Sequence, residues 1–452
     1  MAVVDVFVTR WGSEPFIGGA YSTLGVGAAP SDRTALGEVL GERLTFAGEH
    51  LSVEHPATMH GAYNSGVAAA HRLLSAQPGA NTAIVVGAGL SGLAAAQALQ
   101  GAGLAVTVLE ASNQLGGRAR TETIWDGRLI HPGAAWIHGP VGNPVAHLAT
   151  SVHVRFPPEP PRARHLVFSA RDQAGEVRSF ESAVALDAPS IEEILARTEQ
   201  LHKELGRRAE QHRHGGQPDE TVKPALQALL SEIEDPALRT AVGAQLMQHF
   251  ESLLAGSIND ISLHHGDEPY AYPGGDHYIT TPLEGLVRKL SDGLNVTMNS
   301  PVAAMELRES SVHATSVENH EADVAVLAVP LVPLQRNAIA FTPPLPQHLH
   351  GALHRLRMGS KTKVFVRFTE QWWGDTHTIW MYSSAGTDPT ASPLWPEWVD
   401  ATELAGVPTL FGFVSGHEGK RIADLALTPE GLAVVRTEVE NLFRVVEPAL
   451  GR

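Results

Sequence analysis

The sequence predicts an α/β protein with two domains, organised around a nucleotide-binding βαβ unit. Residues 83–86 form a short, apolar, β-branched run, which is typical of a buried parallel strand. This run leads directly into Gly87, Gly89 and Gly92, which form a G-x-G-x-x-G pattern. The chain has 452 residues, enough to bury two hydrophobic cores.

The residues after the first glycine complete the unit. A helix-forming run follows, and a second strand at residues 105–109 ends at Glu110. Gly87 would allow a tight turn, Gly89 would let the backbone approach a pyrophosphate, and Gly92 would let the helix pack on the strand. The helix N-terminus would attract the phosphates. Glu110 stands where an acid accepts hydrogen bonds from a ribose, so a Rossmann-type βαβ unit is expected at residues 82–120.

A transmembrane span is the alternative for this stretch, because residues 73–109 contain no charged side chain. The scattered glycines and the alternation of strand and helix patterns favour the βαβ unit instead.

Composition excludes several other classes. The net charge of −16 argues against a nucleic-acid surface. The absence of cysteine excludes disulfides and thiolate metal sites. The 23 histidines show no H-E-x-x-H or similar spacing, so no metal site is expected. The N-terminus lacks the basic start of a signal peptide, and we expect a cytoplasmic protein without membrane contact.

Two further motifs follow Glu110: residues 115–121 read LGGRART and residues 133–139 read GAAWIHG. With the glycine unit, they resemble the flavin-containing amine oxidases, which include monoamine and polyamine oxidases and histone lysine demethylases. The resemblance implies FAD rather than NAD as cofactor. In that family the first segment holds the FAD pyrophosphate and the second runs along the flavin. The residues implied are Gly117, Arg118, Gly133, Ala134 and Trp136.

The N-terminal segment, residues 1–74, carries motifs that come at the C-terminal end of the family's proteins, in the same internal order. The motifs are GGAYS at 18–22, LTFAGEH at 44–50 and HPATMHGAYNSG at 55–66. The chain therefore resembles a circularly permuted member of the family, with a linker at residues 75–81. We expect its ends to lie between a helix ending near Val446 and a strand starting near Val3.

The resemblance assigns roles within these motifs. Glu49 corresponds to an acid that contacts the flavin ribityl chain. Thr58 and Met59 would present backbone N–H groups to the flavin pyrimidine end. Tyr21 would line the substrate side of the flavin, with an ordinary packing role as the alternative. Ala20 stands where monoamine oxidases carry a flavin-linked cysteine, which implies a non-covalent flavin.

The fold class implied is an FAD-binding, GR2-like Rossmann domain with a second α+β substrate domain, in permuted chain order. Helices are expected at residues 190–205, with Ser190 as N-cap, and at 224–230 and 236–254, while 155–178 would be loop or short strands. The domains expected are the FAD-binding domain at 1–150, the helical part of the substrate domain at 151–270, the return to the FAD domain at 271–335, and the substrate-domain sheet and closing helices at 336–452.

Three more residues receive roles from the resemblance. The segment at residues 358–368, followed by Trp372 and Trp373, resembles one in which a lysine holds a water at flavin N5. Its register gives Lys363, with Lys361 as a second candidate. Val302 matches a position that contacts the adenine. His138 would contact substrate or water, with packing as the alternative.

The function implied is that of an FAD-dependent amine oxidase. Hydride would pass from the α-carbon of a neutral amine to flavin N5, giving an imine, and O2 would be reduced to hydrogen peroxide. A flavin desaturase or an amino-acid monooxygenase is the alternative on the same fold, and a non-catalytic flavin-binding scaffold is the alternative of another class. The expected partners are a small-molecule amine and O2, and a homodimer is left open.

Overall fold

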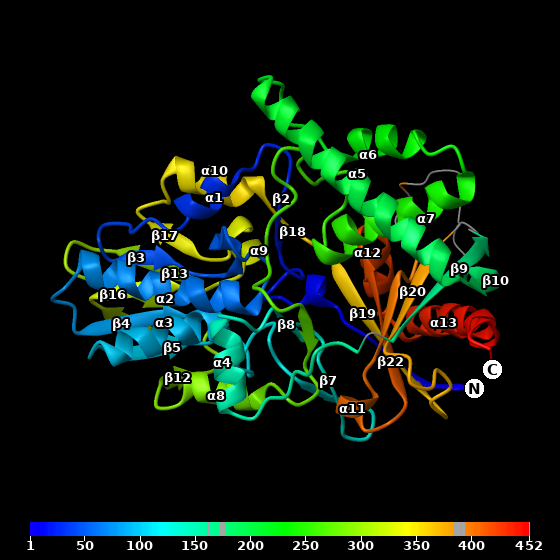
Figure 1. The fold of residues 1–452 in the computed structure, drawn as a ribbon. Helices are drawn as coiled ribbons and strands as arrows, with labels where there is room; N and C mark the ends of the chain where they lie inside the picture. Colours follow the sequence, from blue (N-terminus) through cyan, green and yellow to red (C-terminus); the bar gives the residue numbers. More distant parts are fainter. Residues whose placement is uncertain (161, 172–176, 384–389, 391–393, 452) are drawn as a thin grey trace.

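The structure is a computed structural model that describes residues 1–160, 162–171, 177–383, 390 and 394–451. It contains two main sheets that lie side by side (Figure 1). A parallel five-stranded sheet with its helices forms one half, and a seven-stranded sheet forms the other. Helices α5, α6 and α7 lie together over the second half.

The parallel sheet has the strand order β12-β5-β4-β16-β3, and every neighbouring pair in it is parallel. Its strands are β12 (Asn295–Thr297), β5 (Ala105–Leu109), β4 (Thr82–Val86), β16 (Val324–Leu327) and β3 (Leu44–Phe46). Helices α2 (Met59–Ala76) and α3 (Leu90–Gly101) pack on it and against each other. The close approach depends on Gly66, where a Cβ would lie 2.0 Å from the Ser91 carbonyl oxygen.

The uncharged run at residues 73–109 is thus divided among α2, β4, α3 and β5, each a short element of this half. None of the helices formed by the described residues combines the length and apolar character needed to span a lipid bilayer.

The seven-stranded sheet has the order β1-β19-β22-β21-β20-β9-β10 and is antiparallel except between β20 and β9. Its strands are β1 (Val3–Val8), β19 (Lys361–Phe368), β22 (Thr409–Ser415), β21 (Glu397–Asp400), β20 (Thr378–Ser383), β9 (Ala163–Arg171) and β10 (Ser179–Ala185). Val364, Val366 and Phe368 of β19 point to the core formed with α12 (Gly416–Leu425) and α13 (Pro429–Ala449). Phe365 points to the opposite face, toward an aromatic cluster.

Two of the expected domain boundaries are corrected by this sheet. Strand β1 pairs with β19, so residues 1–150 do not all belong to the parallel-sheet half. Strands β9 and β10 extend the seven-stranded sheet, so residues 151–270 are not wholly helical, and residues 163–171 of the stretch expected as loop or short strands form the nine-residue strand β9. Residues 161 and 172–176 of that stretch lie outside the described part of the chain.

The helical group contains α5 (Ala188–His214), α6 (Val222–Ser231), α7 (Pro236–Met247) and the π-helix η3 (Gln248–Leu253). The expectation that Ser190 caps α5 is wrong. Asp187 is the N-cap, because its carboxylate accepts a hydrogen bond from the Ser190 backbone N–H and a proline occupies the first turn. The helix also continues past its expected end at residue 205, where Arg208 pairs with Glu204 one turn earlier.

The remaining elements include a four-stranded sheet with the order β15-β14-β13-β17 and three two-stranded sheets. They are η1 (Trp11–Ser13), β2 (Ser22–Leu24), α1 (Pro30–Ala35), η2 (Glu49–Leu51), β6 (Glu122–Ile124), β7 (Arg128–Ile130), β8 (Trp136–His138), α4 (Pro144–Ser151), β11 (Asp276–Tyr278), α8 (Glu284–Ser291), β13 (Ala304–Leu307), β14 (Val312–Thr315), β15 (Asn319–Ala322), α9 (Leu331–Gln335), β17 (Ala340–Thr342), α10 (Gln347–Arg355), β18 (Leu356–Met358) and α11 (Thr402–Ala405).

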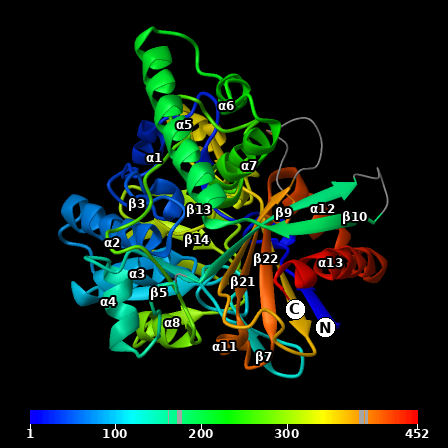
Figure 2. The ribbon, with the colours of Figure 1, turned by 45° about the vertical axis from the view of Figure 1, so that its right-hand side comes forward.

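The two ends of the chain meet, as Figures 1 and 2 both show. The amino group of Met1 lies 3.3 Å from a carboxylate oxygen of Glu447 near the end of α13. This agrees with ends placed between a strand near Val3 and a helix near Val446.

Candidate active site

A cavity of about 520 Å³ lies between the two halves. Residues far apart in the chain form its walls, among them the N-terminal segment as far as Ala62, the glycine turn after β4, the segments 116–120, 132–138 and 300–303, and strands β19 and β22. The expected site residues that line it are Gly87, Gly89, Glu110, Gly117, Arg118, Gly133, Ala134, Trp136, Val302, Glu49, Thr58, Met59, Tyr21, His138 and Lys363. Gly92 is not among the lining residues.

The three glycines of the turn differ in what surrounds them. Gly87 has a φ of +99°, and a Cβ on it would lie 2.6 Å from the Ala328 carbonyl oxygen. A Cβ on Gly92 would lie 1.9 Å from the Gly87 carbonyl oxygen. A Cβ on Gly89 would meet no heavy atom of the described chain within 4 Å. The fold itself therefore requires Gly87 and Gly92, whereas the space beside Gly89 is open to the cavity.

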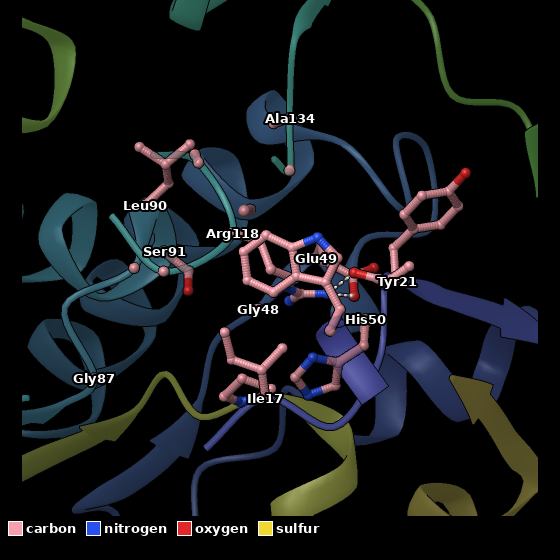
Figure 3. A pocket seen from close by; sticks show the side chains of 18 of the residues that line it. Ile17, Tyr21, Gly48, Glu49, His50, Gly87, Leu90, Ser91, Arg118 and Ala134 are labelled. Atoms are coloured by element: carbon pink, nitrogen blue, oxygen red, sulfur yellow. Dashed lines mark hydrogen bonds and ion pairs between the residues drawn. The ribbon is translucent and has the colours of Figure 1, made fainter. Parts of the chain in front are cut away.

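Helix α3 begins at this turn and presents its N-terminus to the cavity. Leu90 and Ser91 line the cavity, and the N-cap residue Gly89 has no side chain to cap the first-turn N–H groups. Uncapped N–H groups and the positive end of the helix dipole favour an anion. Figure 3 shows Gly87, Leu90 and Ser91 together at one end of the pocket and Tyr21 at the other.

Glu110 follows β5 beside the turn and stabilises the loop around it. One of its carboxylate oxygens accepts a hydrogen bond from the Ala88 N–H at 2.7 Å, and the other accepts from the Ser112 N–H at 2.8 Å and hydroxyl at 2.7 Å. A carboxylate has about four acceptor positions, so this residue keeps capacity for a further donor from the cavity.

Glu49 is the centre of a buried polar network. Its carboxylate accepts hydrogen bonds from the N–H and hydroxyl of Ser22, from the Ala57 N–H, and from Arg118 at 3.0 Å. Burial acts to raise the pKa of Glu49, but nearby positive charge, that of Arg118 first, outweighs burial and lowers the pKa to about 2. Figure 3 shows Glu49 and Arg118 in the middle of the pocket. The network joins the N-terminal segment to the stretch after the glycine turn.

His50 was missed by reasoning from the sequence, although it directly follows Glu49. It is fully buried, lines the cavity, and neither of its ring nitrogens has a hydrogen-bond partner among the described residues. Burial lowers the pKa of His50 to about 4, so its ring is neutral at pH 7. A buried polar group without a partner is unfavourable, which fits a cavity that receives a polar molecule.

Tyr21 contributes its ring to the cavity, while its hydroxyl group is bound elsewhere. The hydroxyl donates to the backbone carbonyl oxygens of Ser252 at 3.1 Å and Leu253 at 2.8 Å in η3. Burial raises the pKa of this phenol. In Figure 3 the hydroxyl points away from Glu49 and His50. The residue therefore presents a fixed aromatic wall and not an acid or base.

Two lysines two residues apart on β19 both line the cavity. Lys363 donates from Nζ to the carbonyl oxygens of His131 at 3.0 Å and Gly133 at 2.6 Å. The Nζ of Lys361 lies 3.9 Å from the ring centroid of Phe413. Burial, and then the charge of Lys361, lower the pKa of Lys363 well below its ordinary value.

A buried carboxylate accompanies the lysines. Glu397 lies on β21, and its side chain accepts a hydrogen bond from Gln248 at 3.5 Å. Burial raises the pKa of Glu397, while the charge of Lys361 opposes this shift. No pattern in the sequence indicates this neighbour, because β21 and β19 are brought together only through β22.

His138 on β8 is held by a carboxylate on the paired strand β11. Its Nδ1 lies 2.9 Å from Asp276, and its ring meets Tyr270 edge-on with centroids 5.2 Å apart. The neighbouring Trp136 donates from its indole N–H to Glu159. His138 lines the cavity, whereas Asp276 and His277 are not among the lining residues.

The sequence and the fold of this chain are similar to those of known proteins. The sequence model of the family described as flavin containing amine oxidoreductase matches residues 3–74 and 90–450. Lysine-specific histone demethylase 1B of Mus musculus is 29% identical over 327 residues, which cover 70% of this chain but 38% of that protein. Polyamine oxidase 4 of Oryza sativa subsp. japonica is 26% identical over 375 residues, which cover 80% of this chain and 72% of that protein. The solved structure of cyclohexylamine oxidase from Brevibacterium oxydans IH-35A shares the fold, with a TM-score of 0.59 and 23% identity over 82% of each chain.

Proposed function

Because the chain belongs to the family of flavin containing amine oxidoreductases, we propose that it is an FAD-dependent amine oxidase that binds its flavin non-covalently in the cavity between its two halves. The observation that carries this proposal is the continuity of one cavity from the glycine turn to Tyr21 and Lys363. An uncapped helix end at one side suits a pyrophosphate, and an aromatic wall at the other suits a planar ring.

The residues present fit such a group. The N–H groups of Leu90 and Ser91 would bind the phosphates, and Glu110 would accept hydrogen bonds from a ribose. His50 would find a partner for its unpaired ring nitrogens. When bound, a flavin would supply the two-electron redox chemistry by which an amine is oxidised to an imine and O2 is reduced to hydrogen peroxide.

The chain's own side chains would bind the amine and exclude water. Trp136, Phe413 and the ring of Tyr21 surround the substrate end with apolar surface. Burying a charged amine there without a partner is unfavourable, so this surface favours the neutral amine, which is the form that can be oxidised. Lys363 would hold a water at its Nζ, beside its two carbonyl partners.

The permuted chain order is part of the proposal. Strand β3 and helix α2 complete the parallel-sheet half although they precede the glycine turn in the sequence. Helix α2 runs to Ala76, so residues 77–81 of the expected linker 75–81 would join it to β4 in the permuted order.

The experiment is a screen for substrate with the purified, yellow protein. Monoamines, polyamines and amino acids are added anaerobically, and flavin bleaching is followed by release of peroxide after air is admitted. The product separates the alternatives: an aldehyde with ammonia for an oxidase, a C=C bond for a desaturase, a carboxamide for a monooxygenase. Absence of bleaching by any of these compounds would contradict the proposal. Flavin that passes through a filter after acid denaturation is the result expected for non-covalent binding.

Lys363→Met tests the lysine assignment, and Lys361→Met is the matched control. Both side chains lie on the same face of β19 and line the same cavity. We expect Lys363→Met to slow reoxidation by O2 on the order of 10²-fold, as for loss of one positioned donor. Lys361→Met should leave that step within a few-fold of wild type. If Lys361→Met slowed reoxidation more than Lys363→Met, the role proposed for Lys363 would belong to Lys361.

A further inference from the structure

Outside the cavity, three side chains with metal-binding chemistry converge on the helical part of the molecule. They are His202 on α5, His249 on η3 and Asp267 in the segment that follows η3. We propose that they form a binding site for one divalent transition-metal ion, for which Zn²⁺ is the best match. The proposal is independent of the oxidase reaction.

The geometry of the cluster carries the proposal. The Nε2 atom of His202 lies 2.9 Å from one carboxylate oxygen of Asp267, and the Nε2 atom of His249 lies 3.1 Å from the other. One ligand atom from each residue lies within 4.8 Å of the others. Ligands of a tetrahedral zinc ion, with bonds of about 2.0–2.1 Å, are roughly 3.4 Å apart. The atoms would thus move by little more than about 1 Å to share an ion.

The ligand chemistry suits zinc. Two imidazole nitrogens and one carboxylate oxygen are common zinc ligands, and three protein ligands leave a fourth position for water. The side chains of His202, His249 and Asp267 are 33%, 28% and 53% exposed, so an ion can reach them from solvent.

Two other histidine pairs in the described chain are weaker candidates. His350 and His354 are exposed one turn apart on α10, with ring centroids 4.2 Å apart, but His354 Nδ1 lies 2.8 Å from the His350 carbonyl oxygen. His212 and His264 hydrogen bond to one another at 2.8 Å. Neither pair is among the groups of three candidate ligands. His354→Gln is therefore the matched control for an exposed histidine.

The location of the site gives the ion a structural effect. His249 lies in η3, whose Ser252 and Leu253 carbonyl groups hold the Tyr21 hydroxyl. An ion at the site would tie η3 to α5 and to the segment of Asp267. Because an ion that binds only the folded protein stabilises it, the melting temperature should rise with metal concentration.

The test uses the full flavin-containing protein, freed of metal with a chelator and then dialysed. Zinc chloride is titrated against a zinc-binding dye, and the melting temperature is measured at each concentration. We expect one tight equivalent per chain and a rise in melting temperature. His202→Gln and His249→Gln should each lose both effects, while His354→Gln should retain them.

Each outcome of the titration either supports the site or overturns it. No tight equivalent in the wild-type protein would overturn the proposal. So would a tight equivalent that persists in His249→Gln, or one that is lost in His354→Gln. Flavin absorbance and the melting temperature without metal, if unchanged, show that each variant is folded. If one of the two histidine variants fails to fold, the other still tests the site.

Discussion

Replacing Glu49 with glutamine tests whether this buried carboxylate stabilises the junction between the N-terminal segment and the glycine turn. Glutamine keeps the shape of the side chain but removes the negative charge. Arg118 then lies within 3.0 Å of a neutral group, and the hydrogen bonds from Ser22 and Ala57 lose their charged acceptor. Breaking a buried ion pair by removing one partner typically lowers the free energy of unfolding by about 3–5 kcal/mol.

The pKa shift of Glu49 determines how the stability difference between wild type and variant changes with pH. The pKa of Glu49 falls from an ordinary 4.5 to about 2 on folding, so its ionisation stabilises the folded chain above pH 4.5, and this stabilisation is lost as pH falls toward 2. At about 1.36 kcal/mol for each pKa unit, the contribution is about 3 kcal/mol at pH 7 and about 2 kcal/mol at pH 3.5. The difference in free energy of unfolding between wild type and Glu49→Gln should therefore be smaller at pH 3.5 than at pH 7, by about 1 kcal/mol.

Urea unfolding at pH 7 and at pH 3.5, monitored by tryptophan fluorescence, measures this difference in free energy of unfolding. Glu14→Gln is the control, because Glu14 is 45% exposed and lies 3.6 Å from Arg120. An exposed pair of this kind contributes less than about 1 kcal/mol. A gap for Glu49→Gln that is below about 1 kcal/mol at pH 7, or that does not narrow at pH 3.5, would refute the reasoning.

Three further predictions concern the turn and a second buried pair. Gly92→Ala should destabilise the fold and abolish soluble yellow protein, because its Cβ would lie 1.9 Å from the Gly87 carbonyl oxygen; normal yield with full flavin would contradict this. Gly89→Ala should fold with unchanged melting temperature in the flavin-free state but bind flavin more weakly, measured by fluorescence quenching, since its Cβ enters only the cavity. Arg33→Met should lower the free energy of unfolding by about 3–5 kcal/mol, because it leaves Glu268 buried and without its ion-pair partner. Adding Glu268→Gln should recover part of this loss. A double variant that is no more stable than Arg33→Met would argue against the ion pair.

The βαβ unit could be predicted from sequence because every signal that specifies it is local. An apolar strand, the glycine spacing and a helix-forming run lie within residues 82–109, and β4, α3 and β5 form there. The motifs of the N-terminal segment could likewise be recognised as short strings. Their residues Tyr21, Glu49 and Thr58 do line one cavity with the turn.

What the sequence did not disclose depends on pairing between distant segments. Strand β1 could be recognised as a strand, but no residue within it indicates that β19 is its pairing partner. The carboxylate of Glu397 and the pair formed by Arg33 and Glu268 are brought to the site only by tertiary packing. His50 could have been noticed, because it directly follows Glu49. Its ring nitrogens are buried without a hydrogen-bond partner among the described residues, and this cannot be deduced from the sequence.

The pairing of β1 with β19 has a consequence for synthesis on the ribosome. Strand β1 is mostly apolar, and it can pair at the sheet edge only after β19 has been made: the hydrogen bond from the Lys363 N–H to the Thr9 hydroxyl spans 354 residues. At about 5–20 residues per second, the nascent strand stays without that neighbour for roughly 20–70 s. Until then it has a free edge open to aggregation, and a bound chaperone would protect it.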